Sequence, residues 1–262
     1  ILDQMAARVG GTQLGEANFF LRRLRAQRLF LDGEFARSDE LWQEALARAT
    51  RAGLSYAEMF HSVHVFNVRL EREGPRAMLD RVRASLASPR LMQGTRASLL
   101  RTAAAAGDLE LVRAHLDELG DPAGFARGIG YLHMLASVAT CAAALGDRAR
   151  CEQLRDFLSP HAQLNTPDVM GFYLGSVSHF LGLLHAALGD LEAADASFTH
   201  ADTRNRAMGY RAGVVRTALA RGQLELQRGQ RARAQELLDQ ACTLADRLKM
   251  QWVAAAATDT HR

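Results

Sequence analysis

The chain has 262 residues, 48% of them hydrophobic, so it is long enough to bury a core and has the composition of a folded protein. Its 32 basic and 29 acidic residues leave a net charge of +3, which is too small an excess to predict direct nucleic-acid binding. Lys249 is the only lysine, and no G-x-x-x-x-G-K-[ST] motif occurs, which excludes a phosphate-binding P-loop from this segment.

The cysteines and the apolar runs predict a location. Cys141, Cys151 and Cys242 are an odd number without a C-x-x-C pair, which favours a reducing cytoplasm over a disulfide framework or zinc site. No apolar run approaches the roughly 20 residues of a membrane span, so no membrane contact is predicted. The start at Ile1, without a signal segment, leads us to expect a piece of a longer protein. The dominance of arginine and alanine suggests a GC-rich bacterial genome.

Helical stretches are separated by glycines at intervals of roughly 40 residues, which is typical of paired-helix repeats. These marker glycines are Gly33, Gly74, Gly107, Gly146, Gly189 and Gly229. Apolar residues recur at helical spacing on both sides of each one. In chain order, the predicted helices are about 13–31 and 35–52, 54–72 and 75–87, 90–105 and 109–119, 122–145 and 147–158, 167–188 and 191–208, and 210–228 and 231–248. Stubs before Thr12 and after Met250 are predicted to be cut helices.

The predicted fold is all-α: a tetratricopeptide-like helical-repeat solenoid of about six antiparallel helix pairs in a right-handed superhelix. It forms one domain over residues 1–262, with repeats at about 13–52, 54–87, 90–119, 122–158, 167–208 and 210–248. Small residues five and twelve positions after a marker glycine are expected to be buried at helix crossings, as at Ala194, Ala201, Ala234 and Ala241.

Three stretches resemble a known family. They are residues 181–198, the L-A-S-V-A-T-C-A-A-A-L-G-D of 135–147, and the R-A-R-A-Q-E-L-L-D-Q-A-C-T-L-A-D-R-L of 231–248. They resemble the C-terminal repeat regions of large bacterial signalling ATPases, such as LuxR-type transcriptional regulators akin to the maltose-regulon activator, and relatives with adenylate cyclase or kinase domains. The resemblance covers about residues 131–250. It implies a sensor arm that receives an inducer or partner and controls a nucleotide-binding module.

No motif predicts an enzyme in this segment. There is no G-x-S-x-G elbow, H-E-x-x-H helix or calcium loop, and no cofactor is predicted. His61 and His64 lie one turn apart, but without a third ligand they favour a polar face over a metal site. The arginines near residue 25 favour a solvated helix face, and Cys151 falls in a packing column, which favours a buried inert thiol.

A binding groove is predicted from the repeat register, because the first helix of each tetratricopeptide pair lines the concave face. Positions about thirteen, ten and six residues before the marker glycines form this set. It comprises Phe20, Arg23, Gln27, His61, His64, Arg101, His133, Thr140, His179, Arg216 and Gln223. No carboxylate falls in these columns, so the groove suits an acidic peptide or an anionic small-molecule inducer. Protonation of its histidines near pH 6.5 predicts tighter binding of an anion at lower pH. A one-residue error in register would move the set off the groove.

Two functional classes stay open. The first is a non-catalytic protein- or ligand-binding regulatory domain of a multidomain signalling or transcription-regulating protein, with an ATPase or other effector domain in the same chain. The second is a stand-alone adaptor that holds two proteins together. Apolar Trp252 and Val253 follow the last complete pair, so we expect an exposed C-terminal face and self-association through the array ends.

Overall fold

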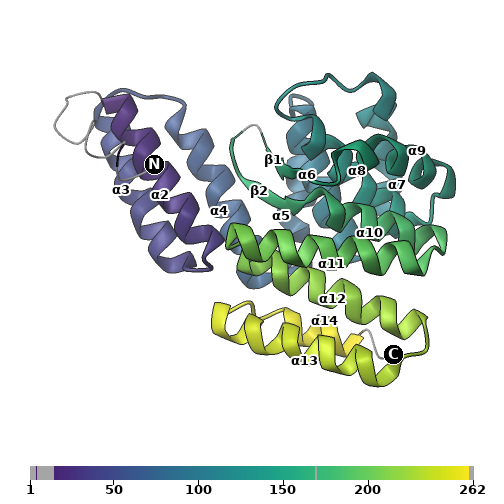
Figure 1. The fold of residues 1–262 in the computed structure, drawn as a ribbon. Coiled ribbons are helices and arrows are strands. Elements are labelled where there is room, and N and C mark those ends of the chain that lie inside the picture. The colour runs from purple at the N-terminus through teal and green to yellow at the C-terminus, as the bar shows by residue number, and fades with distance from the viewer. Residues whose placement is uncertain (1–3, 5–14, 169, 260–262) are drawn as a thin grey trace.

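The computed structural model describes residue 4, residues 15–168 and residues 170–259 (Figure 1). Over these residues the chain consists of helices joined mostly by short turns, which confirms the all-α prediction. The N-terminal helices are α2 (Gly15–Leu31), α3 (Phe35–Arg51), α4 (Ala57–Glu73), α5 (Leu79–Leu86), α6 (Gln93–Ala106) and α7 (Leu109–His115). They are followed by α8 (Tyr131–Leu145), α9 (Arg148–Leu158), α10 (Val177–Leu188), α11 (Leu191–Met208), α12 (Arg211–Gln227), α13 (Arg231–Leu248) and α14 (Val253–Asp259). The predicted stub before Thr12 lies outside the described residues.

Short elements complete the chain. The 3-10 helices are η1 (Arg76–Met78), η2 (Leu116–Leu119), η3 (Pro122–Gly124) and η4 (Ser159–His161). Strand β1 (Asn165–Pro167) pairs antiparallel with β2 (Tyr173–Ser176) in a small hairpin. No helix among the described residues is long and apolar enough to cross a membrane.

Three of the turns are built by a Gly-Asp pair. The glycine ends one helix in the left-handed conformation, with φ of 85°, 67° and 86° at Gly107, Gly146 and Gly189. The aspartate that follows caps the next helix, and its carboxylate accepts a hydrogen bond at 3.1 Å from the N–H group three residues on. The marker glycines therefore separate successive helices for a local reason that is visible in the sequence.

Small residues hold the paired helices close together, as predicted. Ala194, Ala201, Ala234 and Ala241 are all at most 1% exposed. Two glycines on the facing helices add to the fit: a Cβ on Gly182 would lie 2.5 Å from the Phe198 ring, and one on Gly222 would lie 2.6 Å from Leu238. The close approach thus depends on a missing side chain opposite a bulky one.

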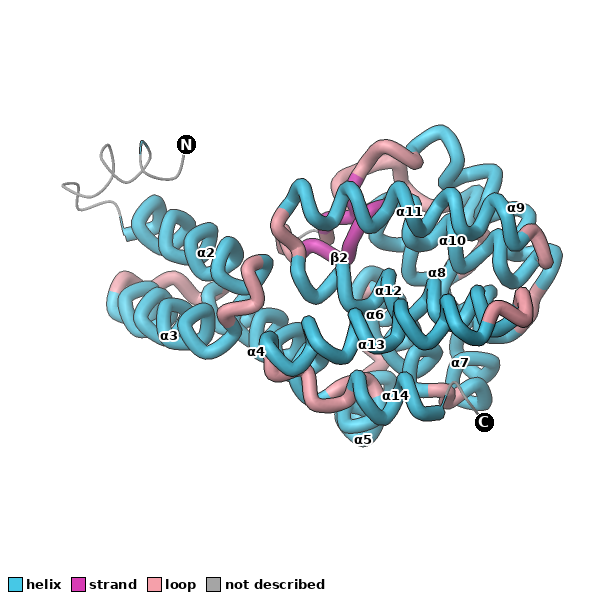
Figure 2. The backbone as a smooth tube through the Cα atoms, turned by 60° about the horizontal axis from the view of Figure 1, so that its bottom comes forward, coloured by secondary structure: helices cyan, strands magenta, loops and turns pink. Residues whose placement is uncertain are grey.

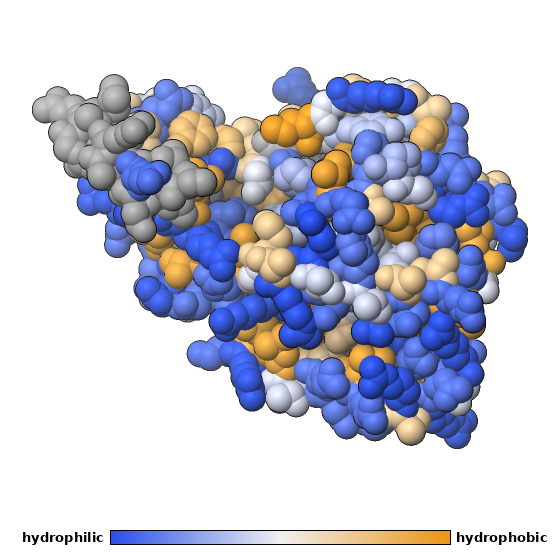
Figure 3. All heavy atoms as spheres, in the orientation of Figure 1, coloured by the Kyte–Doolittle hydropathy of each residue, from blue (hydrophilic) through white to orange (hydrophobic). Residues whose placement is uncertain are grey.

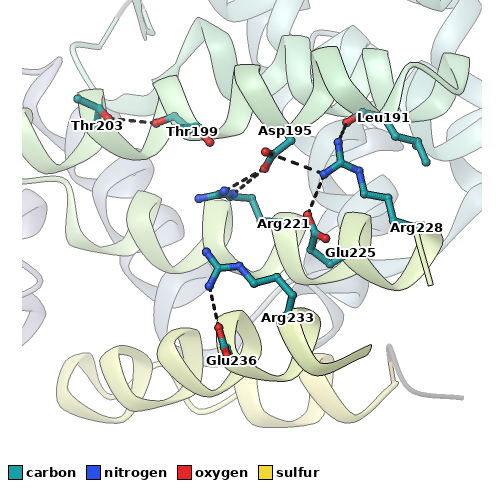
Figure 4. A network of polar contacts seen from close by, with 9 residues as sticks. All are labelled: Leu191, Asp195, Thr199, Thr203, Arg221, Glu225, Arg228, Arg233 and Glu236. Carbon is teal, nitrogen blue, oxygen red and sulfur yellow. Dashed lines mark hydrogen bonds and ion pairs between the residues drawn. The ribbon is translucent and has the colours of Figure 1, made fainter. Parts of the chain in front are cut away.

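Polar contacts connect α11 to α12 at the surface (Figure 4). The guanidinium of Arg221 donates to Asp195 through Nε at 3.1 Å and Nη2 at 2.9 Å. Arg228 donates to the Leu191 carbonyl at 2.6 Å and to Glu225 at 3.1 Å. These contacts fix the relative position of neighbouring helices, but they involve residues of the array itself and do not form a ligand site.

The helices enclose one large apolar core between α4 and α10, and a second core joins the two ends of the array. In the second core, Phe30 and Phe35 from the first helix pair cluster with Tyr210, Val215 and other residues of α12–α14. Accordingly, α4 lies near the C-terminal helices in both ribbon views (Figure 1, Figure 2). Helices from the two ends of the described chain therefore pack against each other through this core.

Hydrogen bonds also join α4 to the turn before α14. The indole Nε1 of Trp252 donates to the Glu71 carbonyl at 2.8 Å, and the Gln251 N–H donates to the Arg72 carbonyl at 3.1 Å. A Cβ on Gly74 would lie 2.4 Å from Trp252, so only glycine allows this approach. The predicted exposure of Trp252 and Val253 is wrong, because Trp252 is half-buried and Val253 is fully buried. These two residues give no support to self-association.

Two predicted helices begin later than expected. The helix predicted at 122–145 starts at Tyr131, and the one predicted at 167–188 starts at Val177. Proline suggested both early starts, but glycines follow each proline before the real helix begins, and Gly171 and Gly175 adopt φ of 78° and 137°. The two segments are instead a loop and a hairpin, and both help to form the site.

Candidate ligand-binding site

A cavity of about 1290 Å³ lies between α4, α6, the segment 119–134 and the β-hairpin. Met59 and Met92 line it and are 43% and 55% exposed, so it opens to the surface. The space-filling view shows a notch between the N-terminal helices and the rest of the molecule, with apolar residues on its walls (Figure 3). The volume exceeds that of most small-molecule sites, so a sizeable ligand fits.

Most of the wall is apolar, and it comes from three parts of the chain. The contributing side chains are Val63 and Phe66 from α4, Leu91, Met92 and Leu99 from α6 and the turn before it, and Leu119, Phe125 and Met134 from the segment 119–134. The late start of α8 matters here, because a helix from residue 122 would have replaced the loop that carries Phe125.

Polar and charged side chains also line the cavity, among them Arg101, His133, Asp168 and His61, with Arg81 and Asp121 at exposed positions. His133 is 4% exposed, and its Nε2 lies 2.8 Å from Ser98 Oγ and 3.3 Å from the Gly94 carbonyl. Burial, together with the positive charge of Arg101, lowers the pKa of His133 to about 4. His133 is therefore neutral at physiological pH, and its buried Nδ1 has no hydrogen-bond partner within the described residues.

Arg101, from the middle of α6, lies deep in the structure yet keeps part of its surface accessible. Among the described residues it forms no hydrogen bond or ion pair, and its buried Nε is without a partner. Burial and the positive charge of Arg216 lower the pKa of Arg101 from its ordinary value. The site thus contains a guanidinium whose positive charge is disfavoured by burial and by a second positive charge nearby.

The neighbouring Arg216 is, by contrast, fully engaged. It donates to the Glu71 carboxylate, to the Tyr210 hydroxyl and, at 3.3 Å, to the carbonyl of Leu174, which lines the cavity. Tyr210 also donates to Glu71 at 3.0 Å. Burial is the largest single influence and acts to lower the pKa of Arg216, but the charges and hydrogen bonds of Glu71 and Tyr210 together outweigh it, so the pKa is raised.

Asp168 is held by the hairpin backbone. Its Oδ1 accepts hydrogen bonds from the N–H groups of Met170 at 2.8 Å and Phe172 at 2.7 Å. Burial raises the pKa of Asp168, while those hydrogen bonds and the charges of Arg23 and Arg101 act in the opposite direction. Arg23 itself donates to the Met170 carbonyl.

The structure brings together part of the predicted groove. His61, Arg101 and His133 line the cavity, and Arg23 and Arg216 bond to carbonyls of residues that line it. The other members lie elsewhere: Gln27 is half-buried on α2, His64 bonds Asp39 at 2.8 Å, Thr140 bonds the Ala136 carbonyl, His179 bonds Thr217, and Gln223 is exposed on α12.

Two features of the predicted groove need correction. The interior holds the carboxylates of Glu71 and Asp168, which lie outside the columns that the repeat register selects. The histidines do not titrate near pH 6.5 as we expected: burial lowers the pKa of His64 and His61, and lowers that of His179 to about 3. Stronger anion binding through histidine protonation at pH 6 is therefore not expected.

The buried cysteines have low reactivity. Burial raises the pKa of the Cys141 thiol to about 12 and that of Cys151 to about 11, which makes both poor nucleophiles. No cluster of His, Cys, Asp or Glu among the described residues has the arrangement of a metal site.

No protein-family model, curated protein or solved structure matches this chain. The resemblance to repeat regions of bacterial signalling ATPases is therefore an expectation from sequence alone.

Proposed function

We propose that this chain is a non-catalytic, ligand-binding regulatory domain of a multidomain bacterial signalling or transcription-regulating protein, and that the cavity takes its small-molecule inducer. The observation that carries the proposal is the cavity of about 1290 Å³, with apolar walls and a few charged groups. Small-molecule sites have this composition, since apolar walls supply affinity and a few polar groups set orientation.

The position of α4 supports a regulatory role for this binding. Phe66 and Asn67 of α4 line the cavity, and Glu71, one turn later, bonds Arg216 and Tyr210 of the C-terminal half. A ligand that displaces α4 would therefore disturb the contact between the two ends of the array. An effector domain elsewhere in the same chain would respond to that change.

Ligand binding is favoured over the adaptor alternative by the closure of the array. An adaptor of the tetratricopeptide type uses an open concave face for peptide capture, whereas here Phe30, Tyr210 and Arg216 are engaged in contacts between the two ends of the chain.

Binding of a neutral polarity-sensitive dye, Nile red, tests the proposal, because the dye reports apolar sites without requiring a charge. The parent protein should bind Nile red with a blue-shifted emission. Met134→Trp, which places a bulkier ring in the cavity wall, should weaken binding by about tenfold or more, because the ring obstructs the apolar surface that the dye contacts. Gln223→Trp, an equally large residue at an exposed position of α12, is the control and should bind like the parent. Equal binding by all three proteins would place the dye elsewhere and refute the cavity as the ligand site.

A further inference from the structure

The cavity wall contains a largely enclosed cation. Arg101 forms no hydrogen bond or ion pair within the described part of the chain, although it is surrounded by protein. An unpaired buried charge is costly, so proteins normally pair such a group with an acidic side chain or use it to bind a ligand.

The nearby carboxylates each hold other partners through one oxygen. Glu71 Oε1 accepts hydrogen bonds from Arg216 and Tyr210, while its buried Oε2 has no partner, and Oδ1 of Asp168 accepts two from the hairpin backbone. Arg23 donates to the Met170 carbonyl and Arg216 donates to Glu71, whereas Arg101 has no hydrogen-bond acceptor among the described residues.

The surroundings of Arg101 determine which anion would fit. Arg101 carries a single positive charge, so a monoanion would pair with it one to one. The guanidinium has a planar set of donors that matches the two oxygens of a carboxylate. Leu91, Phe125 and Met134 of the same wall offer apolar surface, which favours an apolar body.

We propose that Arg101 is the anion-binding residue of the cavity and that the ligand is an amphipathic organic acid, with its carboxylate on Arg101 and its apolar part against the loop 119–134 and α6. This inference rests on the proposed function, since it names the class of ligand that the same cavity takes. His133 beside it is neutral and adds a hydrogen-bonding group, not a charge.

Displacement of bound Nile red by two matched competitors tests the inference. Decanoate carries the carboxylate, and decanamide has the same chain length with a neutral head. We expect the parent protein to bind decanoate about tenfold or more tightly than decanamide, the size of effect that one charge-assisted contact gives. Arg101→Met should remove this preference while leaving the affinities for decanamide and Nile red within about twofold, and Arg101→Lys should restore part of it.

Arg81→Met is the matched control, because Arg81 lines the same cavity but is exposed at its rim. It should change decanoate affinity by less than about threefold, as exposed charges contribute little. Equal affinity of the parent for decanoate and decanamide, an Arg101→Met protein that keeps the preference, or failure of both competitors to displace the dye would each overturn the inference. The proposed function would survive those results as long as Met134→Trp blocks Nile red. If Nile red does not bind in the cavity, the proposed function and this inference are both refuted.

Discussion

The buried histidines of this chain are neutral bases in an environment that resists their protonation. Burial lowers the pKa of His133 to about 4 and that of His179 to about 3, and neighbouring arginines add to the effect. Because the unfolded chain takes up protons near pH 6.5, it binds more protons than the folded chain between pH 6.5 and about 4. The free energy of unfolding should be fully retained above pH 6.5 and fall as the pH drops through this range.

Urea unfolding at pH 7.5, 6.5 and 5.5 measures this effect in the parent and in His133→Gln. Each such histidine contributes a slope of up to about 1.4 kcal/mol per pH unit, so the variant should lose less stability than the parent on acidification. Gln keeps a polar group beside Ser98 but cannot be protonated in this range. Parallel curves for the two proteins would show that His133 titrates normally in the folded state.

At the residue scale, the sequence predicted part of the site. The repeat register selected Arg101, His133 and His61 because all three lie on the first helices of their pairs, where an inward-facing position recurs with the repeat. It missed Asp168 because the hairpin that carries it has no counterpart in the other repeats. It missed Glu71 because a charged residue near a helix end is normally expected to be exposed, whereas contacts with distant residues such as Arg216 and Tyr210 bury this one.

At the element scale, small residues at helix crossings determine how closely the pairs approach. Ala194 is fully buried beside Phe198 and Leu224, with no room for a larger side chain. We expect Ala194→Trp to overpack the crossing and lower the free energy of unfolding by roughly 1–3 kcal/mol. Thermal or urea unfolding provides the measurement.

Ala196→Trp is the matched control, because Ala196 lies on the same helix and is exposed. Its unfolding free energy should stay within about 0.5 kcal/mol of the parent, as for most surface substitutions. If Ala194→Trp is as stable as Ala196→Trp, α11 does not pack through Ala194.

The predictable elements were those that repeat. Turn glycines and small-residue columns located α11 to α13 within a few residues, since each carries its own start and stop signals. The segments around Pro122 and Pro167 lack a repeat partner. There, Gly124, Gly128 and Gly171 had the stronger local effect, and they produced the loop and hairpin that form two sides of the cavity.

At the scale of the whole molecule, contact between the two ends of the array shapes the site. Tyr210 and Trp252 bond to Glu71 across sequence separations of 139 and 181 residues. Helical periodicity reports only which face of a helix is apolar, not which distant helix covers it. The sequence therefore predicted the pairs and left this contact undetected, and the handedness of the array stays a prediction.

Removing the charge of Glu71 tests the contact between the ends. Glu71→Gln leaves Arg216 buried without its counterion, and breaking a buried ion pair in this way costs about 3–5 kcal/mol. Glu73→Gln, at an exposed position on the same helix, should be nearly neutral. Urea unfolding of both variants gives the comparison. If Glu71→Gln unfolds at the same urea concentration as Glu73→Gln, the contact between α4 and α12 does not form as described.

A crystal structure of the protein grown with decanoate tests the central claim most directly, because it locates the ligand and its charged group together. The account predicts the acyl chain inside the cavity, against Leu91 and Phe125, and the carboxylate within hydrogen-bonding distance of the Arg101 guanidinium. Decanoate bound outside the cavity, or an Arg101 paired with Asp168 while the ligand's carboxylate points to solvent, would contradict it.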